Sequence, residues 1–274
     1  MRVGERTVRS VWDGSWTFPA ELAYPSQTRQ DWERHRTHLD ADGNFQIGIG
    51  GFLVETGSRN ILVDLGFGEP TSTFPQFEAK FLDNLAALGQ TPEDITDVVL
   101  THVHADHFGW ASRDGRPVFT NATYRCHLKD WELYVTKGEP QPLAGPLGFP
   151  STDATYWLGP VQDRFEHWDG DVTIAPGVDV VEAAGHTPGH TVVVVSSGEE
   201  RAVLLGDVAH SPVELIEPEW QMIGDHDPEL SKETRASLVR EFAGTGARMA
   251  GSNFKDLRFG RIETTKGHLE WIYD

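Results

Sequence analysis

The stretch Thr101-His-Val-His-Ala-Asp-His-Phe-Gly109 guides the interpretation of the whole sequence. It follows the apolar run Val98-Val-Leu100, which predicts a short buried strand, and it places three histidines and one aspartate within six positions. Neutral imidazole and carboxylate are ligands for Zn²⁺, and also for Fe²⁺, Mn²⁺ or Co²⁺. Histidine-rich loops are sometimes only polar surface, but this density directly after a buried strand favours a metal site.

Two further segments place ligand-type residues at predicted strand ends. Gly185-His-Thr-Pro-Gly-His190 follows a predicted strand at 178–183, and Leu204-Leu-Gly-Asp207 ends a predicted strand at 201–206. Loops over a rigid sheet commonly carry functional residues. Gly-Asp after an apolar strand is by itself more typical of a turn. Together with the first stretch, however, these segments indicate one site built from three parts of the chain.

The order of predicted elements favours an α/β (α+β) fold in a single domain, residues 1–274. Strands dominate and helices come singly, which fits a four-layer αββα sandwich, although other α/β folds share this order. Within the domain we expect an aromatic N-terminal segment, 1–44, that could line a pocket, and a lid insertion within 129–165. Strands are predicted at 6–11, 45–55, 60–65, 98–100, 117–126, 171–175, 178–183, 191–196, 201–206 and 247–250, and helices at 76–88, 91–94, from about 129 and at 228–242.

The composition of the chain indicates which classes of partner and which cellular location to expect. The chain has 274 residues with 23 Lys and Arg against 42 Asp and Glu, a formal net charge of −19. Such acidity would repel a phosphate backbone, so we expect no nucleic-acid partner. We also expect no membrane segment, because no apolar run approaches the roughly 20 residues that a spanning helix needs. Cys126 is the single cysteine, which excludes an internal disulfide, and the N-terminal residues lack a signal-peptide pattern. A cytoplasmic enzyme is expected.

The motif HxHxDH, then GHTPGH, then an apolar strand ending in GD resembles the metallo-β-lactamase superfamily. The order and spacing are similar to the branch of N-acyl homoserine lactone lactonases and methyl parathion hydrolases. The resemblance spans about residues 48–262 and implies the αββα sandwich with a binuclear metal site between loop ends of the two sheets. It also implies a small-molecule substrate and a homodimer.

The resemblance also implies a role for each motif residue. His102, His104 and His186 would bind the first metal, Asp106 and His107 the second, and Asp207 would bridge the two. Asp106 or Asp207 would accept or relay a proton during catalysis. Other residues would support the ligands through hydrogen bonds: Asp64 at the end of a strand, and His190 within its own loop.

One position departs from the family pattern. Relatives supply a last histidine to the second metal before an FGRI-like strand, and this sequence has Asn253 there, ahead of Phe259-Gly-Arg-Ile262. An amide oxygen is a weaker ligand than imidazole for borderline-soft metals. We therefore expect one or two divalent ions, zinc first with iron or manganese as alternatives, and a second site that is weak, filled through water or empty. His210, His226 and His268 are candidate substitutes, and His210 is the best placed of them. Its alternative role is to support a ligand or to face the substrate.

The expected activity is hydrolysis by a metal-activated hydroxide. The sequence lacks a GxSxG nucleophile pattern, which disfavours covalent acyl catalysis. The acidic balance favours a neutral, fairly apolar ester or lactone, or a similar activated bond such as a phosphotriester or an activated aryl ether. Two alternatives remain open. One is a β-lactamase or thioesterase of the same fold, and the other is a non-catalytic partner subunit with a degenerate metal site.

Overall fold

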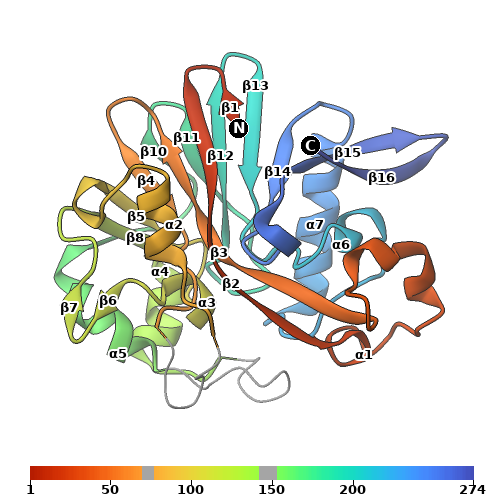
Figure 1. Ribbon diagram of the computed structural model, residues 1–274, viewed down its shortest axis with the longest axis horizontal. Helices are drawn as coiled ribbons and strands as arrows, with labels where there is room; N and C mark the ends of the chain where they lie inside the picture. The colour runs from red at the N-terminus through yellow and green to blue at the C-terminus, as the bar shows by residue number, and fades with distance from the viewer. Residues whose placement is uncertain (70–76, 142–152) are drawn as a thin grey trace.

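The computed structural model describes residues 1–69, 77–141 and 153–274. Its strands form two seven-stranded sheets and one small hairpin (Figure 1). The first sheet has the order β1 (Arg2–Val3), β2 (Arg6–Pro19), β3 (Asn44–Glu55), β4 (Asn60–Val63), β5 (Asp97–Val99), β8 (Thr123–His127), β9 (Phe165–Trp168). The second has the order β10 (Val172–Ala175), β11 (Val178–Glu182), β12 (Thr191–Ser197), β13 (Glu200–Leu204), β14 (Arg248–Ala250), β15 (Gly260–Thr265), β16 (His268–Tyr273), and the hairpin pairs β6 (Ser112–Arg113) with β7 (Arg116–Pro117).

The helices are short, apart from one in the C-terminal part of the chain. In Figure 1 most helices of the first half of the chain lie on one outer side of the molecule, and the long helix α7 lies on the other side. The helices are α1 (Ala20–Ala23), α2 (Phe81–Ala87), α3 (Ala105–Phe108), α4 (Leu128–Asp130), α5 (Ala154–Leu158), α6 (Val213–Ile216), α7 (Pro228–Phe242), the 3₁₀ segments η1 (Asp31–His38), η2 (Pro92–Asp94), η4 (Gly159–Arg164), η5 (Lys255–Leu257), and the π segment η3 (Trp131–Thr136).

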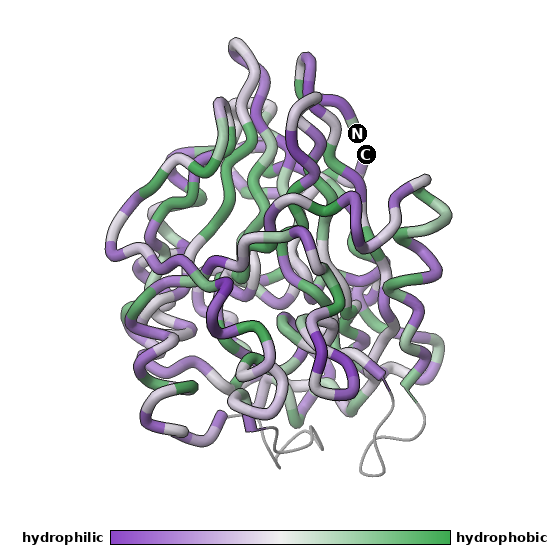
Figure 2. Tube along the Cα trace, turned by 90° about the vertical axis from the view of Figure 1, so that its left-hand side faces the viewer, coloured by the Kyte–Doolittle hydropathy of each residue, from purple (hydrophilic) through white to green (hydrophobic). Residues whose placement is uncertain are grey.

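Three apolar layers define the sandwich. In β4, Ile61 and Val63 face the layer between the two sheets, whereas Leu62 packs outward into the layer that contains Leu85 of α2. This alternation follows from the two-residue period of a strand whose faces are both covered. A third layer packs the second sheet against α7, for instance through Phe242. Figure 2 shows the same pattern, with hydrophobic segments along the inner strands. The αββα architecture that the sequence predicts is therefore confirmed.

Several predicted boundaries differ from the structure. The N-terminal strand runs over 6–19 rather than 6–11, because β2 pairs with β3 along its whole length through a bulge between Trp12 and Gly14. The strand predicted at 117–126 is divided, since a loop separates β7 from β8. The predicted helix at 76–88 is described only from residue 77, and α2 covers 81–87.

The two segments proposed to shape a pocket can be described only in part. Tyr24 and Trp32 of the N-terminal segment are buried, and each packs edge-on against another aromatic ring rather than facing open space. Part of the lid predicted within 129–165 falls on residues 142–152, which lie outside the described residues. Among the described residues no helix is both long enough and apolar enough to cross a bilayer.

Strand direction gathers the chemically important loops at one place. β4 pairs in parallel with β5 in the first sheet, and β13 pairs in parallel with β14 in the second. The carboxyl ends of parallel strands meet at the same sheet edge. Residues just after these four strands, such as Asp64 and Asp207, therefore lie at the end of the sandwich where the two sheets' loops converge.

Candidate metal centre

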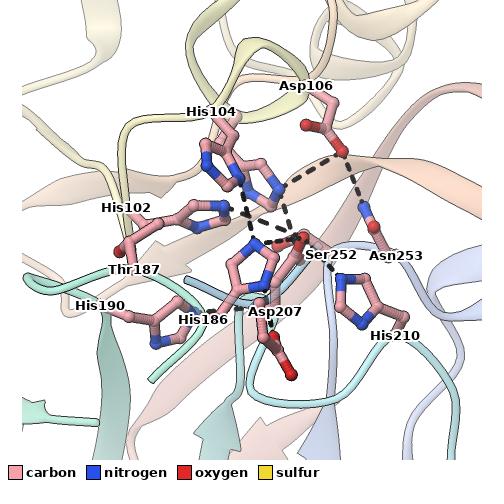
Figure 3. A network of polar contacts seen from close by, with 12 residues as sticks. His102, His104, Asp106, His186, Thr187, His190, Asp207, His210, Ser252 and Asn253 are labelled. Atoms are coloured by element: carbon pink, nitrogen blue, oxygen red, sulfur yellow. Dashed lines mark hydrogen bonds and ion pairs between the residues drawn. The ribbon is translucent and has the colours of Figure 1, made fainter. Parts of the chain in front are cut away.

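Three histidines from two loops meet at the first part of the site. His102 and His104 follow β5, and His186 follows β11. One ring nitrogen of each lies within 4.8 Å of the others, and all three side chains are buried (Figure 3). The closest approach joins Nε2 of His186 to Nδ1 of His104 at 3.0 Å. The structure thus brings together the three residues that the sequence assigns to a first metal.

Asp207 lies between this group and a second one. Its Oδ2 is 3.8 Å from Nε2 of His102 and 3.6 Å from Nε2 of His186. Its Oδ1 faces the other way, 3.3 Å from Nε2 of His107, which is also 3.4 Å from Oδ2 of Asp106. The two oxygens of one carboxylate therefore face two separate donor groups, which is the arrangement of a bridging ligand.

Hydrogen bonds on the far side of two rings turn their free lone pairs inward. Nδ1 of His186 lies 2.9 Å from Oδ1 of Asp225, and Nδ1 of His102 lies 3.1 Å from Oγ1 of Thr101. The Thr101 hydroxyl donates to Asp64, so it accepts from the His102 ring. With Nδ1 donating in each ring, Nε2 presents its lone pair to the site.

Asp64 supports several parts of the site at once. Its carboxylate accepts hydrogen bonds from the Thr101 backbone at 2.8 Å and from the Ser252 hydroxyl at 2.6 Å, and it lies 3.0 Å from Nδ1 of His107. The residue is fully buried and has a positive φ of 60°, an uncommon conformation for a residue other than glycine. Asp64, just after β4, therefore links the loops after β5 and β14 through its hydrogen bonds.

The buried donors fit a divalent cation. Nε2 of His102, Nε2 of His107 and Oδ1 of Asp207 are buried without a hydrogen-bond partner among the described residues. Such orphaned polar atoms are costly unless something binds them. Burial lowers the pKa of His102 and of His104 well below the ordinary value, so both rings are neutral and can donate lone pairs. Burial raises the pKa of Asp207, but the nearby imidazoles outweigh it and hold that pKa below its usual range.

His190 lies close to the cluster but uses its ring differently. Its Nε2 accepts a hydrogen bond of 2.9 Å from the backbone N–H of Asp207, so that lone pair is already engaged. The sequence predicted a hydrogen bond within the loop of His190, but the partner of its Nε2 belongs to the loop after β13. His190 therefore fixes the backbone that carries Asp207, and burial lowers its pKa to about 3.

Asn253 and His210 lie on different sides of Asp207. Nδ2 of Asn253 donates to Oδ2 of Asp106 at 3.1 Å, beside His107. Nε2 of His210 lies 3.4 Å from Oδ2 of Asp207, the oxygen that faces His186. His210 therefore does not occupy the position of the missing second-metal histidine. His226 and His268, the other candidate substitutes, are exposed.

Asp130, at the end of α4, supports the loops around the site, and no sequence pattern predicts this. It is fully buried and accepts hydrogen bonds from the Thr187 hydroxyl, the Gly189 N–H and the Val103 N–H at 2.6, 2.6 and 3.2 Å. A Cβ on Gly189 would lie 2.8 Å from the Asp130 carboxylate, which explains the glycine in the GHTPGH segment. Asp130 thereby joins the two histidine loops. No local pattern signals it, because its partners are distant in sequence.

Comparison with known proteins agrees with this geometry. The family model described as "Metallo-beta-lactamase superfamily" matches residues 51–250. The N-acyl homoserine lactonase AiiA of Bacillus thuringiensis subsp. kurstaki is 26% identical over 198 residues, which cover 66% of this chain and 70% of that protein.

Two solved structures share the fold over nearly the whole chain. AidC, described as a dizinc quorum-quenching lactonase in complex with a product, superposes with a TM-score of 0.85 at 24% identity, covering 100% of this chain and 96% of that one. The hydrolase AbOPH superposes with a TM-score of 0.82 at 27% identity, covering 99% and 95%. With its αββα layers and its converging histidine and aspartate loops, this chain belongs to the metallo-β-lactamase superfamily.

Proposed function

We propose that this chain is a metal-dependent hydrolase that opens lactone rings, with N-acyl homoserine lactones as the first substrates to test. The observation that carries the proposal is that proposed ligands from two other loops converge on the two oxygens of Asp207, so that three loops form one donor set. The lactone substrate class is supported by the relatives, since AiiA is named a lactonase and AidC is described as one. The ligands of the proposed site are His102, His104, Asp106, His107, His186 and Asp207.

Zinc is the metal we propose. The donor set is rich in imidazole and completed by carboxylates, which suits Zn²⁺, and AidC is described as a dizinc enzyme. The second position is the weaker one in our proposal, because Asn253 offers an amide where imidazole would bind more strongly. Iron and manganese accept the same donors and are alternatives.

The chain's own residues would then bind the substrate, orient it and move a proton. A divalent cation held by these residues would supply Lewis-acid chemistry, which favours deprotonation of water and polarisation of a substrate carbonyl. Asp106 is the more accessible of the two site carboxylates, and its pKa is held below the ordinary value because His107 outweighs the effect of burial. We propose that Asp106 or Asp207 accepts the proton that the attacking water releases. His210 approaches the same oxygen of Asp207 as His186 does.

A broader substrate range remains part of the proposal. A neutral ester, a phosphotriester or an activated aryl ether is attacked by the same nucleophile, and β-lactamase or thioesterase activity would use the same fold. A degenerate, non-catalytic subunit is disfavoured because the side chains of the six proposed ligands converge within the structure.

The test is a substrate panel with and without metal. We would measure proton release from homoserine lactones of several acyl lengths, beside a chromogenic aryl ester, a phosphotriester and a β-lactam. His104→Ala should abolish turnover, whereas His226→Ala, an exposed histidine outside the cluster, should not. Lactone hydrolysis that survives chelation and verified metal depletion would contradict the proposal. Turnover of the β-lactam alone would favour the alternative.

A further inference from the structure

Two buried carboxylates lie behind the site in the segment between β13 and α7. Glu214 belongs to α6, and Asp225 lies in the loop that precedes α7. No described hydrogen bond or ion pair joins Glu214 or Asp225 directly to Asp207. Each instead lies behind one imidazole that does face Asp207. Charged groups at such depth are retained only where they are paired.

Asp225 sets the orientation of His186. Its Oδ1 is 2.9 Å from Nδ1 of His186, whose Nε2 lies 3.6 Å from Oδ2 of Asp207. Gln221 donates to the other oxygen of Asp225 at 2.7 Å, which fixes the carboxylate itself. This is the usual way in which a carboxylate orients a metal-binding histidine.

Glu214 lies behind His210, but its hydrogen bond goes to the His210 backbone rather than to the ring. Its Oε2 accepts the backbone N–H of His210 at 2.6 Å and lies 3.5 Å from the ring Nδ1. Nε2 of His210 is then 3.4 Å from Oδ2 of Asp207, the same oxygen that His186 approaches. Both ring nitrogens of His210 are buried without a hydrogen-bond partner among the described residues, so the backbone bond to Glu214 is its main anchor.

Arg235 of α7 is a buried positive charge near both carboxylates. Its Nη1 donates to the Val208 carbonyl at 3.1 Å and lies 3.8 Å from Oδ2 of Asp225. Burial raises the pKa of Glu214, but the hydrogen bond with His210 and the charge of Arg235 outweigh it and keep that pKa below its ordinary range. The Met222 N–H donates to Oε1 of Glu214 at 2.9 Å. Glu214 therefore has a fixed position and a negative charge.

The aromatic N-terminal segment braces this same region. The rings of Trp32 and Trp220 are 4.7 Å apart, edge to face, and the Ile223 N–H donates to the Ala23 carbonyl at 2.9 Å. Residues 220–223 are the part of the chain that carries the Met222 N–H to Glu214. The N-terminal aromatics thus hold the segment that positions Glu214, which gives them a role beyond filling the core.

We infer that Glu214 is a positioning residue: through the backbone N–H of His210 and beside its Nδ1, it holds that ring with Nε2 facing Asp207. The inference rests on the proposed function, because His210 lies against Asp207, the proposed bridging ligand of that site. No described hydrogen bond or ion pair joins Glu214 to any of the six proposed ligands. Its loss should change the orientation of His210 while leaving bound metal in place, whereas loss of Asp225 should weaken metal binding.

The first experiment observes the ring directly, without substrate. Protein labelled with ¹⁵N-histidine is compared with Glu214→Gln, and the His210 signals are assigned from their absence in His210→Ala. We expect the His210 ring signals to shift in Glu214→Gln and to stay unchanged in the control Glu219→Gln, whose side chain is 87% exposed on the same segment. Unchanged His210 signals in Glu214→Gln would overturn the inference, whatever the enzyme hydrolyses.

The second experiment is a double-mutant cycle. Glu214→Gln should lower kcat for the lactone roughly 10- to 100-fold, with KM and zinc content close to wild type. In the His210→Ala background the same change should have little further effect, because the residue that it positions is gone. An equal loss of kcat in both backgrounds would show a merely structural role and overturn the inference.

Two further variants control for a folding defect and distinguish the role of Glu214 from that of Asp225. If Glu214→Gln does not fold, Glu214→Asp replaces it in both experiments, because it keeps the charge and shortens the reach. Asp225→Asn should lower zinc affinity by roughly 10- to 100-fold. If Glu214→Gln lost as much zinc as Asp225→Asn, His210 would be a metal ligand. That result would contradict the separate roles proposed for Glu214 and Asp225.

Discussion

The amide nitrogen of Asn253 donates a hydrogen bond of 3.1 Å to the carboxylate of Asp106. The residue that replaces the family's histidine therefore contacts a proposed ligand of the second metal instead of standing apart from the site. Asp106 is the more accessible of the two site carboxylates, so its position depends on this contact and on His107. The affinity of the second metal position should be sensitive to residue 253.

Replacement of Asn253 by histidine should strengthen the second metal position. Imidazole is a better donor than an amide for zinc, and we expect on the order of tenfold tighter binding, about 1.4 kcal/mol. Competition with a chromophoric chelator would measure the dissociation constants of both ions. Equal affinity for the second ion in wild type and Asn253→His would show that the native site is not weakened.

Removal of the Asp207 charge should release both ions together. Its two oxygens face the two donor groups, so Asp207→Asn should lower metal content at both positions and reduce kcat/KM by on the order of 10³-fold or more. Metal analysis of the purified variant checks the first effect and lactone turnover the second. Asp163→Asn, at an exposed position, is the matched control. A variant that retained one ion fully would contradict the bridging role.

Gly109, at the end of α3, should not tolerate a side chain. A Cβ there would lie 1.9 Å from the Phe67 backbone and 2.3 Å from the Gly68 nitrogen, so the loops after β4 and β5 would have to separate. Gly109→Ala should cost about 3 kcal/mol of unfolding free energy. Gly159→Ala, where a Cβ meets nothing within 4 Å, is the control and should be close to neutral. Urea denaturation of the two variants measures the difference, and equal midpoints would contradict the close packing.

His38 should make the stability of the protein depend on pH. Burial, with the charges of His35 and Lys255, lowers its pKa from 6.5 to about 4. A histidine with a lowered folded pKa contributes stability that is present above pH 6.5 and lost as the pH falls toward 4, by up to about 3 kcal/mol.

Comparison of His38→Phe with wild type tests this dependence. The variant keeps a ring beside Tyr273, whose ring centroid is 6.2 Å from that of His38. Between pH 4 and 6.5 its unfolding free energy should fall less steeply than that of the wild type, both measured after chelation so that metal release does not contribute. His268→Asn, at an exposed histidine, should retain the wild-type slope. Parallel slopes for His38→Phe and wild type would mean that His38 is not the group responsible.

The sequence by itself determined the family and predicted the group of histidines and aspartates that the fold brings together. The dense histidine stretch after Val98-Val-Leu100, the GHTPGH loop and the aspartate after 201–206 are local patterns, because a ligand and the strand that carries it are neighbours in the chain. The order of the predicted elements, with many strands and single helices, also predicted the αββα sandwich, and the structure confirms this.

The tertiary structure alone decided what holds the centre together. Asp130, Glu214 and Asp225 are single acidic residues in unremarkable surroundings, and their partners lie in loops that meet only through the strand order. The full length of β2 likewise depends on its pairing with β3 rather than on local propensity. A proposed ligand can be predicted from the residues beside it in the chain. A supporting carboxylate cannot, because its hydrogen-bond partner lies in a distant loop that only the fold brings close.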